Sequence, residues 1–357
     1  MNILYVINSL RIGGAEKIVS DIVLQFKKKG YNIGVLIFDG YDTILKETLI
    51  DNKIDVYCIS TKSIYNPFVI FKIVPIIKRY DIIHSHLFPS QYWVALASCF
   101  CPSIIKIITT EHSTSNKRRN HLLTRITDTI IYKMYDKIIT ISDKALLLFN
   151  ESYGSLKGKS VCIYNGVDIS KFKSSYPNSD IRKTGNDVFV TMVASFRYPK
   201  DQDTIIKALQ FLPDNYKALF VGDGPRIELC KQLAIDLGVD SRTIFMGVRN
   251  DVPSILHSSD IIVLSSKYEG LSLSSLEGMC VGKPFIASNV DGLEEVVSDA
   301  GLLFEYGDYN TLAKILLSLM TDSNLYNRVA KQCLLRAEQY DIGETVRRYE
   351  LLYNELM

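Results

Sequence analysis

The stretch that decides the fold is IIVLSSKYEGLSLSSLEGMCVGKPFIA, residues 261–287. It opens with four apolar residues, Ile261–Leu264, and closes with another apolar run at Phe285–Ala287. Between these runs the sequence predicts a polar turn and a helix that begins near Ser272 and continues through Glu277. A strand, a helix and a second strand in this order indicate two parallel strands joined by a helical crossover.

The same alternation fills the rest of the second half. The other predicted strands there are Val188–Val193, Lys217–Val221 and Thr243–Met246, and the predicted helices are Asp203–Leu212, Arg226–Leu237 and Val252–Ser258. Short apolar strands that alternate with helices are typical of a doubly wound α/β domain. Residues 341–357 end the chain with an amphipathic helical pattern.

The first half predicts a second domain of the same class. Its predicted strands are Ile3–Ile7, Val35–Phe38, Val56–Ile59, Ile82–His84, Ile104–Thr109, Lys137–Ile141 and Val161–Ile163, and its clearest helices are Ala15–Lys29, Phe68–Arg79 and His121–Tyr135. The segment 173–187 is polar, contains Pro and Gly, and lacks an apolar period. We therefore predict an N-terminal domain at 1–175, a linker at 176–187 and a C-terminal domain at 188–340.

Composition supports two globular domains. The chain has 357 residues, of which 47% are hydrophobic and 22% charged, so it can bury more than one core. No apolar run reaches the roughly 18 residues of a spanning helix, and MNILYVINSL is typical of a buried strand, so we expect a cytoplasmic protein. The seven cysteines show no paired spacing, which favours buried thiols over a metal site.

The charge is uneven along the chain. Residues 1–175 hold 23 Lys and Arg against 14 Asp and Glu, a net charge of +9, while the remainder holds 18 against 25, a net charge of −7. A basic half attracts an anionic membrane surface, an anionic ligand or nucleic acid. The basic clusters Lys27–Lys29 and Lys117–Arg119 lack interleaved aromatic residues, which disfavours nucleic acid.

Ligands of doubly wound domains bind at the carboxyl ends of the strands, so the strand-to-helix turns are the candidate sites. Gly13 and Gly14 follow the first strand, where a backbone without side chains can approach a phosphate. Arg197 and Lys200 follow strand Val188–Val193, and two cations at this spacing suit a diphosphate. Tight turns follow the next strands, at 221–225 and 245–251.

Glu269 and Glu277 allow two interpretations. A catalytic acid and base would need their carboxyl groups about 5–10 Å apart across a scissile bond, and the sequence does not fix that distance. Alternatively, the helix start binds a phosphate through its free amides and the carboxylates accept hydrogen bonds from sugar hydroxyls. The placement at a strand-to-helix turn favours the second interpretation.

At this point the residues resemble a known family. The motifs are EGLSLSSLEGMCVGKPFIAS from Glu269 onward, IYNGVD at 163–168 with Phe172, GGAE at 13–16, DIIHSHL at 81–87, TTEH at 109–112 and ITIS at 139–142. Together they resemble the retaining, nucleotide-sugar-dependent glycosyltransferases of the GT-B fold, of the family 4 type, which build bacterial surface polysaccharides. The resemblance implies two Rossmann-like domains facing a deep cleft, with the C-terminal helix packing back on the first domain.

The resemblance also implies roles for the matching residues. Arg197 and Lys200 would hold the diphosphate, Glu269 the sugar hydroxyls and Glu277 the ribose hydroxyls, while His86 would lie near the reacting carbon. Other donor contacts would come from Gly13, Gly14, Val248, Arg249, Gly270, Leu271 and Ser272. Which of His84, His86 and His112 lies nearest the reacting carbon stays open, because strand alternation puts the first two on one side.

The expected reaction transfers a hexose-type sugar from a UDP- or GDP-sugar to a hydroxyl of a glycan or lipid-linked acceptor, with retention. We expect no cofactor and no metal, because the cations and the helix start can stabilise the leaving diphosphate. We also expect peripheral contact with an anionic membrane on its inner face, and no nucleic acid. A GT-B epimerase and a non-catalytic nucleotide-sugar-binding protein are the alternatives; a dehydrogenase would need a G-x-G-x-x-G turn that the chain lacks.

Overall fold

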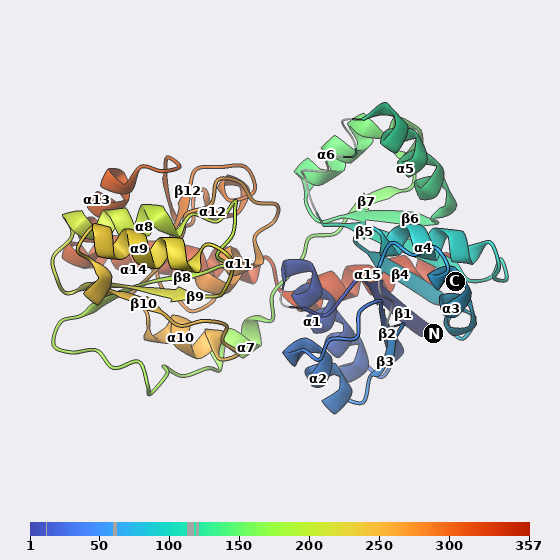
Figure 1. Ribbon diagram of the computed structural model, residues 1–357, viewed down its shortest axis with the longest axis horizontal. Helices are drawn as coiled ribbons and strands as arrows, with labels where there is room; N and C mark the ends of the chain where they lie inside the picture. The colour runs from blue at the N-terminus through green and yellow to red at the C-terminus, as the bar shows by residue number, and fades with distance from the viewer. Residues whose placement is uncertain (12, 60–62, 113–117, 119–120) are drawn as a thin grey trace. The chain divides into compact units, whose positions relative to one another are not determined.

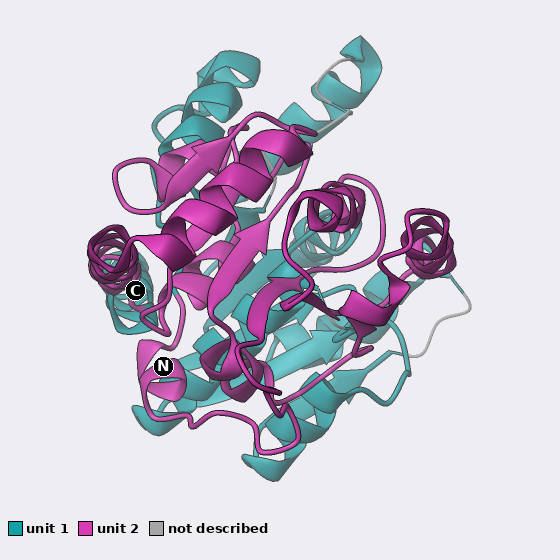
Figure 2. Cartoon of the chain, turned by 90° about the vertical axis from the view of Figure 1, so that its left-hand side faces the viewer, with its two compact units in different colours: residues 1–166, 342–357 teal, residues 167–341 magenta. Residues whose placement is uncertain are grey.

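The computed structural model describes residues 1–11, 13–59, 63–112, 118 and 121–357. These residues form two compact units, one of residues 1–166 with 342–357 and one of residues 167–341 (Figures 1 and 2). None of the described helices combines the length and the apolar composition needed to cross a membrane. We call the two parts unit 1 and unit 2.

Unit 1 is built on a parallel sheet of seven strands in the order β3-β2-β1-β4-β5-β6-β7. The strands are β1 (Asn2–Ile7), β2 (Asn32–Ile37), β3 (Asp55–Cys58), β4 (Ile82–His86), β5 (Lys106–Glu111), β6 (Lys137–Thr140) and β7 (Ser160–Cys162). β1 and β4 lie at the centre, where Tyr5 pairs with His84 and both are fully buried. β4 extends two residues beyond the predicted end at His84, which brings His86 into the strand.

Helices cover both faces of this sheet. They are α1 (Gly14–Lys28), α2 (Ile44–Asp51), α3 (Val69–Ile77), α4 (Ser90–Ser98), α5 (Leu122–Met134) and α6 (Asp143–Ser152). The C-terminal helix α15 (Ile342–Leu356) packs beside α1, so the expectation that it returns to the first domain is confirmed (Figure 1). Val346, Tyr349 and Tyr353 form its buried face.

Unit 2 holds a parallel sheet of six strands in the order β10-β9-β8-β11-β12-β13. The strands are β8 (Val188–Val193), β9 (Tyr216–Val221), β10 (Thr243–Phe245), β11 (Ile261–Leu264), β12 (Phe285–Ser288) and β13 (Leu302–Phe304). The helices are α7 (Ile169–Lys173), α8 (Gln202–Ala208), α9 (Ile227–Asp236), α10 (Val252–Ser258), α11 (Leu273–Met279), α12 (Glu294–Val297), α13 (Tyr309–Thr321) and α14 (Ser323–Glu338). Two doubly wound sheets of this kind confirm the predicted fold class.

The unit boundary lies before α7, whereas the sequence analysis put residues up to 175 with the N-terminal domain. The physical reason is that α7 packs on α10: Phe172 is buried, and its carbonyl lies 2.7 Å from Nε2 of His257. The segment 176–187 lies within unit 2, where the Asn178 amide side chain donates to Asp251. That this segment acts as a linker stays a prediction.

The stretch 261–287 folds as its pattern predicts. β11 and β12 are parallel neighbours, with Ile262 opposite Phe285, and α11 crosses between them. The helix must pass close to the strands at Gly278, because a Cβ there would lie 2.7 Å from the Phe285 ring and 2.9 Å from Ile262. A glycine at this position therefore lets the crossover helix pack on the two strands.

Candidate active site

Three predicted site residues gather where β8 and β11 end in unit 2. Lys200 and Glu269 form an ion pair in which the lysine is 17% and the glutamate 12% exposed. The backbone of Lys200 forms an antiparallel bridge with Ser266, two residues after the end of β11, so the two turns are joined at this edge. Arg197 is exposed, and no ion pair is found for it within the described part of the chain.

The turn that carries Arg197 is held by the turn after β9. The Phe196 amide donates to the Asp223 carbonyl at 2.9 Å, and the Gly222 amide donates to the Gly247 carbonyl at 2.8 Å. Gly222 has φ of 138°, and a Cβ there would lie 2.1 Å from the Ala194 carbonyl oxygen. The GDGP turn therefore needs glycine to lie against the backbone of the Arg197 turn.

The loop that carries Glu269 is also held by backbone contacts, here with Asp291 and Gly292. The Glu269 amide donates to the Asp291 carbonyl at 3.2 Å. Gly292, with φ of 81°, lies so close that a Cβ would be 2.4 Å from the Glu269 carbonyl and 2.1 Å from that of Gly270. Both partners of the ion pair thus sit on loops whose backbones are hydrogen-bonded to neighbouring turns.

Helix α11 begins immediately after this loop. Ser272 is its N-cap, and the hydroxyl accepts from the Ser275 amide at 3.3 Å. Leu271 and Ser272 are buried, whereas Gly270 is partly exposed. Glu277 lies one turn inside the helix with 6% exposure, and Glu269 is engaged by Lys200. This arrangement favours the interpretation that the two glutamates hold a ligand over that of a facing acid and base, and their roles stay predictions.

The turn after β10 carries Val248 and Arg249. Arg249 donates two hydrogen bonds to Asp251, at 2.8 and 2.7 Å, which raises the pKa of the arginine and lowers that of the aspartate. Asp251 also accepts from Asn178 at 2.5 Å. The Arg249 side chain is thus engaged with Asp251. That the backbone of Val248 or Arg249 borders a nucleotide base stays a prediction.

In unit 1 the three predicted histidines lie side by side, and we call His84, His86 and His112 the histidine stack. The ring centroids of His84 and His86 are 4.3 Å apart, and those of His86 and His112 are 5.2 Å apart. His84 is satisfied inside the unit, since Nδ1 lies 2.6 Å from the Tyr353 hydroxyl and Nε2 lies 2.7 Å from that of Thr110. His84 is therefore a core residue.

His86 and His112 share a hydrogen bond of 2.9 Å between Nδ1 of His86 and Nε2 of His112. His86 is fully buried, and its Nε2 has no hydrogen-bond partner among the described residues. His112 is partly exposed at the end of β5. Burial lowers the pKa of His84 and His86 well below the usual value and that of His112 to about 4, so all three rings are neutral near pH 7.

The glycines after β1 lie at the start of α1. Gly13 is the N-cap, and only the flexible Glu16 side chain would meet a Cβ placed there, at 2.3 Å. A Cβ at Gly14 would meet nothing within 4 Å. Among the described residues, packing therefore does not require glycine at residue 14, and its approach to a ligand stays a prediction. Residue 12 lies outside the described residues, as do Lys117 and Arg119 of the predicted basic cluster.

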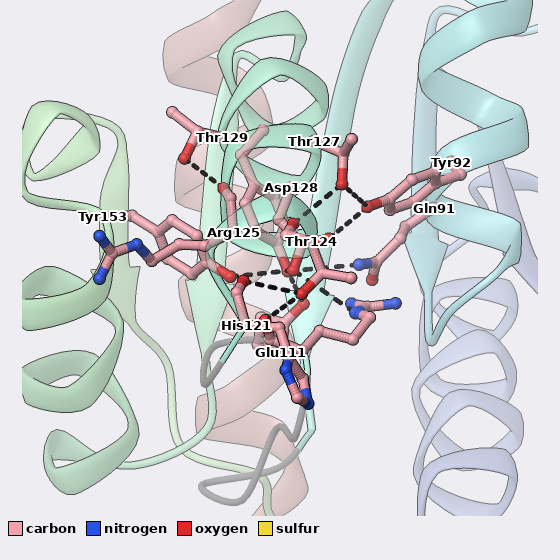
Figure 3. Close-up of polar contacts among 12 residues, drawn as sticks. Gln91, Tyr92, Glu111, His121, Thr124, Arg125, Thr127, Asp128, Thr129 and Tyr153 are labelled. Atoms are coloured by element: carbon pink, nitrogen blue, oxygen red, sulfur yellow. Dashed lines mark hydrogen bonds and ion pairs between the residues drawn. The ribbon is translucent and has the colours of Figure 1, made fainter.

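Sequence reasoning missed a buried polar cluster between α4, α5 and α6 (Figure 3). Asp128 of α5 is fully buried, and it accepts from the hydroxyls of Tyr92 and, at 2.9 Å, Tyr153. Arg118 forms an ion pair with the same carboxylate at 3.4 Å. The sequence pattern did not signal this cluster, because Leu122, Leu123, Ile126 and Ile130 of the helix are exposed and Asp128 is buried. A buried charge requires partners, which the two hydroxyls and Arg118 supply.

The solved structures show which class of fold the two units form. The structure of HepE from Anabaena in complex with UDP-glucose matches with a TM-score of 0.85 over 99% of this chain and 100% of that chain, at 24% sequence identity. At this identity the likeness shows the fold, which is the GT-B architecture of two Rossmann-like domains.

The sequence comparisons give the family. Residues 178–333 match the family described as Glycosyl transferases group 1, and residues 12–171 match the family described as Glycosyltransferase Family 4. The chain belongs to these retaining glycosyltransferases and transfers sugars from nucleotide sugars. The resemblance stated from the motifs is thereby confirmed, and the epimerase, dehydrogenase and purely binding alternatives fall away.

Two curated relatives illustrate the range of acceptors. The N-acetyl-alpha-D-glucosaminyl L-malate synthase of Bacillus anthracis is 27% identical over 299 residues, which are 78% of this chain and 75% of that protein. The UDP-Gal:alpha-D-GlcNAc-diphosphoundecaprenol alpha-1,3-galactosyltransferase of Escherichia coli is 26% identical over 299 residues, 78% of this chain and 76% of that protein. One name specifies malate and the other a lipid-linked sugar, so the family does not by itself fix the acceptor.

Proposed function

We propose that the edge of unit 2 formed by the ends of β8 and β11 binds the nucleotide-sugar donor. Arg197 and Lys200 bind the diphosphate, and Glu269 accepts hydrogen bonds from the sugar hydroxyls. The observation that carries the proposal is the contact between Lys200 and Glu269 beside the exposed Arg197. It puts a phosphate-binding cation and a hydroxyl-binding carboxylate within one side-chain length of each other, as a sugar diphosphate requires.

The neighbouring groups complete the donor site. The amides of Gly270, Leu271 and Ser272 meet the phosphate and the sugar, and Glu277 holds the ribose hydroxyls. The backbone of Val248 or Arg249 borders the base. These groups oppose the charge that develops on the leaving diphosphate, so they act most strongly in the transition state.

In unit 1 we propose that Gly14 approaches the diphosphate and that the histidine stack meets the sugar near the reacting carbon. Within the stack His112 is the partly exposed ring, and His86 supports it from behind through their hydrogen bond. His86, the first choice from the sequence, is thus the buried partner of this pair. A neutral imidazole suits hydrogen bonding to a sugar hydroxyl, because it offers one donor and one acceptor nitrogen.

We propose a UDP- or GDP-sugar as donor and a glycan or lipid-linked acceptor. The HepE structure contains UDP-glucose, and the name of the Escherichia coli relative specifies UDP-Gal and an acceptor on diphosphoundecaprenol. A panel of UDP-, GDP- and ADP-sugars in a thermal-shift assay tests the donor. A melting temperature raised by ADP-sugars alone would contradict this choice.

The outer face of α5 supports contact with an anionic membrane. Leu122, Leu123, Ile126 and Ile130 are between 48% and 79% exposed. The buried face of the same helix carries Asp128, Ile131 and Tyr132, so the four apolar residues named above lie on its exposed face. Exposed cations at Arg125 and Lys133 flank the apolar residues. An apolar stripe with flanking cations suits an anionic lipid surface at the inner face of the membrane.

The site assignment is tested by substitution. Arg197→Ala and Glu269→Ala should each abolish most sugar transfer while the circular-dichroism spectrum stays that of the parent. The melting temperature should stay close to the parent's in Arg197→Ala and fall in Glu269→Ala, which leaves the largely buried Lys200 without its partner. Glu338→Gln is the matched control, because Glu338 pairs with Lys173 in the same unit and is 41% exposed. Near-normal turnover in either alanine variant would remove the assignment.

A further inference from the structure

The ion pair between Lys200 and Glu269 joins the two groups that the proposed function assigns to different parts of the donor. The proposed function assigns Lys200 to the diphosphate and Glu269 to the sugar, yet the two side chains form an ion pair with each other. Neither group can bind the donor fully unless their mutual contact is given up. Binding of the diphosphate and binding of the sugar are therefore linked through the ion pair between Lys200 and Glu269.

The pair is fixed by its surroundings. The backbone amide of Lys200 donates to the Arg197 carbonyl at 2.8 Å, and the Lys200 carbonyl accepts from Arg226 at 3.3 Å. Glu269 is held on its own loop by the hydrogen bond to Asp291 and the close approach of Gly292. With side chains 17% and 12% exposed, both charges are largely removed from water. Leaving one of them without a partner costs more than at an open surface.

We propose that this ion pair makes the site select the complete nucleotide sugar over the nucleoside diphosphate, and thereby favours product release. The inference rests on the proposed function. A nucleoside diphosphate that draws Lys200 away leaves the Glu269 carboxylate with no partner. A complete donor replaces both halves of the contact, because its diphosphate takes Lys200 while its sugar hydroxyls take Glu269.

The same contact then acts after transfer. Once the sugar has moved to the acceptor, Glu269 loses its hydroxyl partners and competes with the diphosphate for Lys200. Arg197 has no ion pair among the described residues, so it can meet the incoming anion first, before Lys200 leaves Glu269. Whether Lys200 is free to bind the diphosphate thus depends on whether a sugar occupies Glu269.

The test measures binding of inorganic pyrophosphate, which needs no knowledge of the base, to the full chain by calorimetry. Glu269→Gln frees Lys200, so pyrophosphate should bind about five- to tenfold tighter, the equivalent of one partly buried ion pair. The same variant should bind UDP-glucose, or GDP-mannose if the donor panel selects guanine, more weakly than the parent does. Product inhibition by UDP or GDP should rise in parallel.

A double-mutant cycle separates the effect of the ion pair from that of electrostatic repulsion between the Glu269 carboxylate and pyrophosphate. In a Lys200→Met background, Glu269→Gln should change pyrophosphate affinity by less than twofold, since no lysine remains to be freed. An equal tightening in both backgrounds overturns the inference, as does an unchanged or weaker affinity in Glu269→Gln alone. Glu338→Gln, which breaks an exposed Lys–Glu pair, should leave pyrophosphate affinity unchanged.

Failure of the inference and failure of the proposed function give different results. If the parent binds pyrophosphate and a nucleotide sugar but Glu269→Gln does not tighten pyrophosphate, only the ion-pair inference falls. If the parent binds neither pyrophosphate nor any nucleotide sugar of the panel, the proposed donor site falls and the inference falls with it. Circular dichroism and melting temperature establish that each variant is folded before binding is compared.

Discussion

Gly292 offers a test of how the Glu269 loop is positioned without changing any side chain that would meet the donor. Its φ of 81° lies in the left-handed region, and a Cβ would lie 2.1 Å from the Gly270 carbonyl oxygen and 2.4 Å from that of Glu269. Gly307 has nearly the same φ, 80°, but a Cβ there would meet nothing within 4 Å. Gly292→Ala and Gly307→Ala should therefore have similar backbone strain, but only Gly292→Ala brings its Cβ against the carbonyls of Glu269 and Gly270.

The expected magnitudes follow from these numbers. Alanine in the left-handed region costs about 1 kcal/mol, so Gly307→Ala should lose about that much unfolding free energy and Gly292→Ala should lose more, because its Cβ also meets two backbone carbonyls. In Gly292→Ala the Gly270 carbonyl must also retreat from 2.1 Å to at least 3.0 Å, a shift of about 0.9 Å. A misplacement of about 1 Å at a catalytic group can lower the rate about 100-fold. Turnover should therefore fall 10- to 100-fold in Gly292→Ala and stay near normal in Gly307→Ala.

The assay combines urea unfolding with initial rates of sugar transfer at saturating donor and acceptor. Rates are compared at a temperature where both variants remain folded, so a loss of stability does not count as a loss of turnover. Equal turnover in the two variants, within threefold, would refute the reasoning that Gly292 sets the position of the Glu269 loop. A Gly307→Ala variant that loses activity as strongly would show that backbone strain alone is responsible.

Three further outcomes are expected. The unfolding free energy should fall as the pH drops from about 6.5 toward 4, because the unfolded chain takes up protons that the folded chain excludes. Each ring of the histidine stack should contribute a loss of up to about 1.4 kcal/mol per pH unit. Equal urea midpoints at pH 7 and 5 would contradict this. Sugar transfer should persist in EDTA, since Arg197 and its neighbours can stabilise the leaving diphosphate, and a strict divalent-metal requirement would count against that role. Sedimentation with phosphatidylglycerol vesicles at low salt should weaken several-fold in Ile126→Glu but not in Leu351→Glu of α15; a parent chain that does not sediment would rule out the membrane contact.

The sequence predicts the architecture well because apolar period and turn composition are local signals. Ser272 was expected near the start of a helix between two parallel strands, and it is the N-cap of α11. The strand ends are less certain, since β4 continues to His86 and β5 begins at Lys106, two residues later than expected. Such ends depend on pairing with neighbouring strands, which the local pattern does not contain.

The site could be predicted only in part, because its contacts join distant residues. Lys200 and Glu269 are 69 positions apart, and their ion pair depends on the bridge between the turns after β8 and β11. Alternation predicts that His84 and His86 share a face, but His112 joins them through the pairing of β4 with β5. Tyr353 reaches His84 from the far end of the chain, which no motif signals.

The glycines and the charged residues of unit 2 have different roles in the site. Gly222 and Gly292 place neighbouring backbone against the loops of Arg197 and Glu269, and the lack of a side chain is what permits both approaches. The charged side chains can then stay partly exposed to a ligand, because backbone contacts behind them fix their loops. A substitution at the exposed Arg197 should therefore change affinity and rate with little loss of stability, whereas one at Gly222 or Gly292 should change both the position of a loop and the stability of the protein.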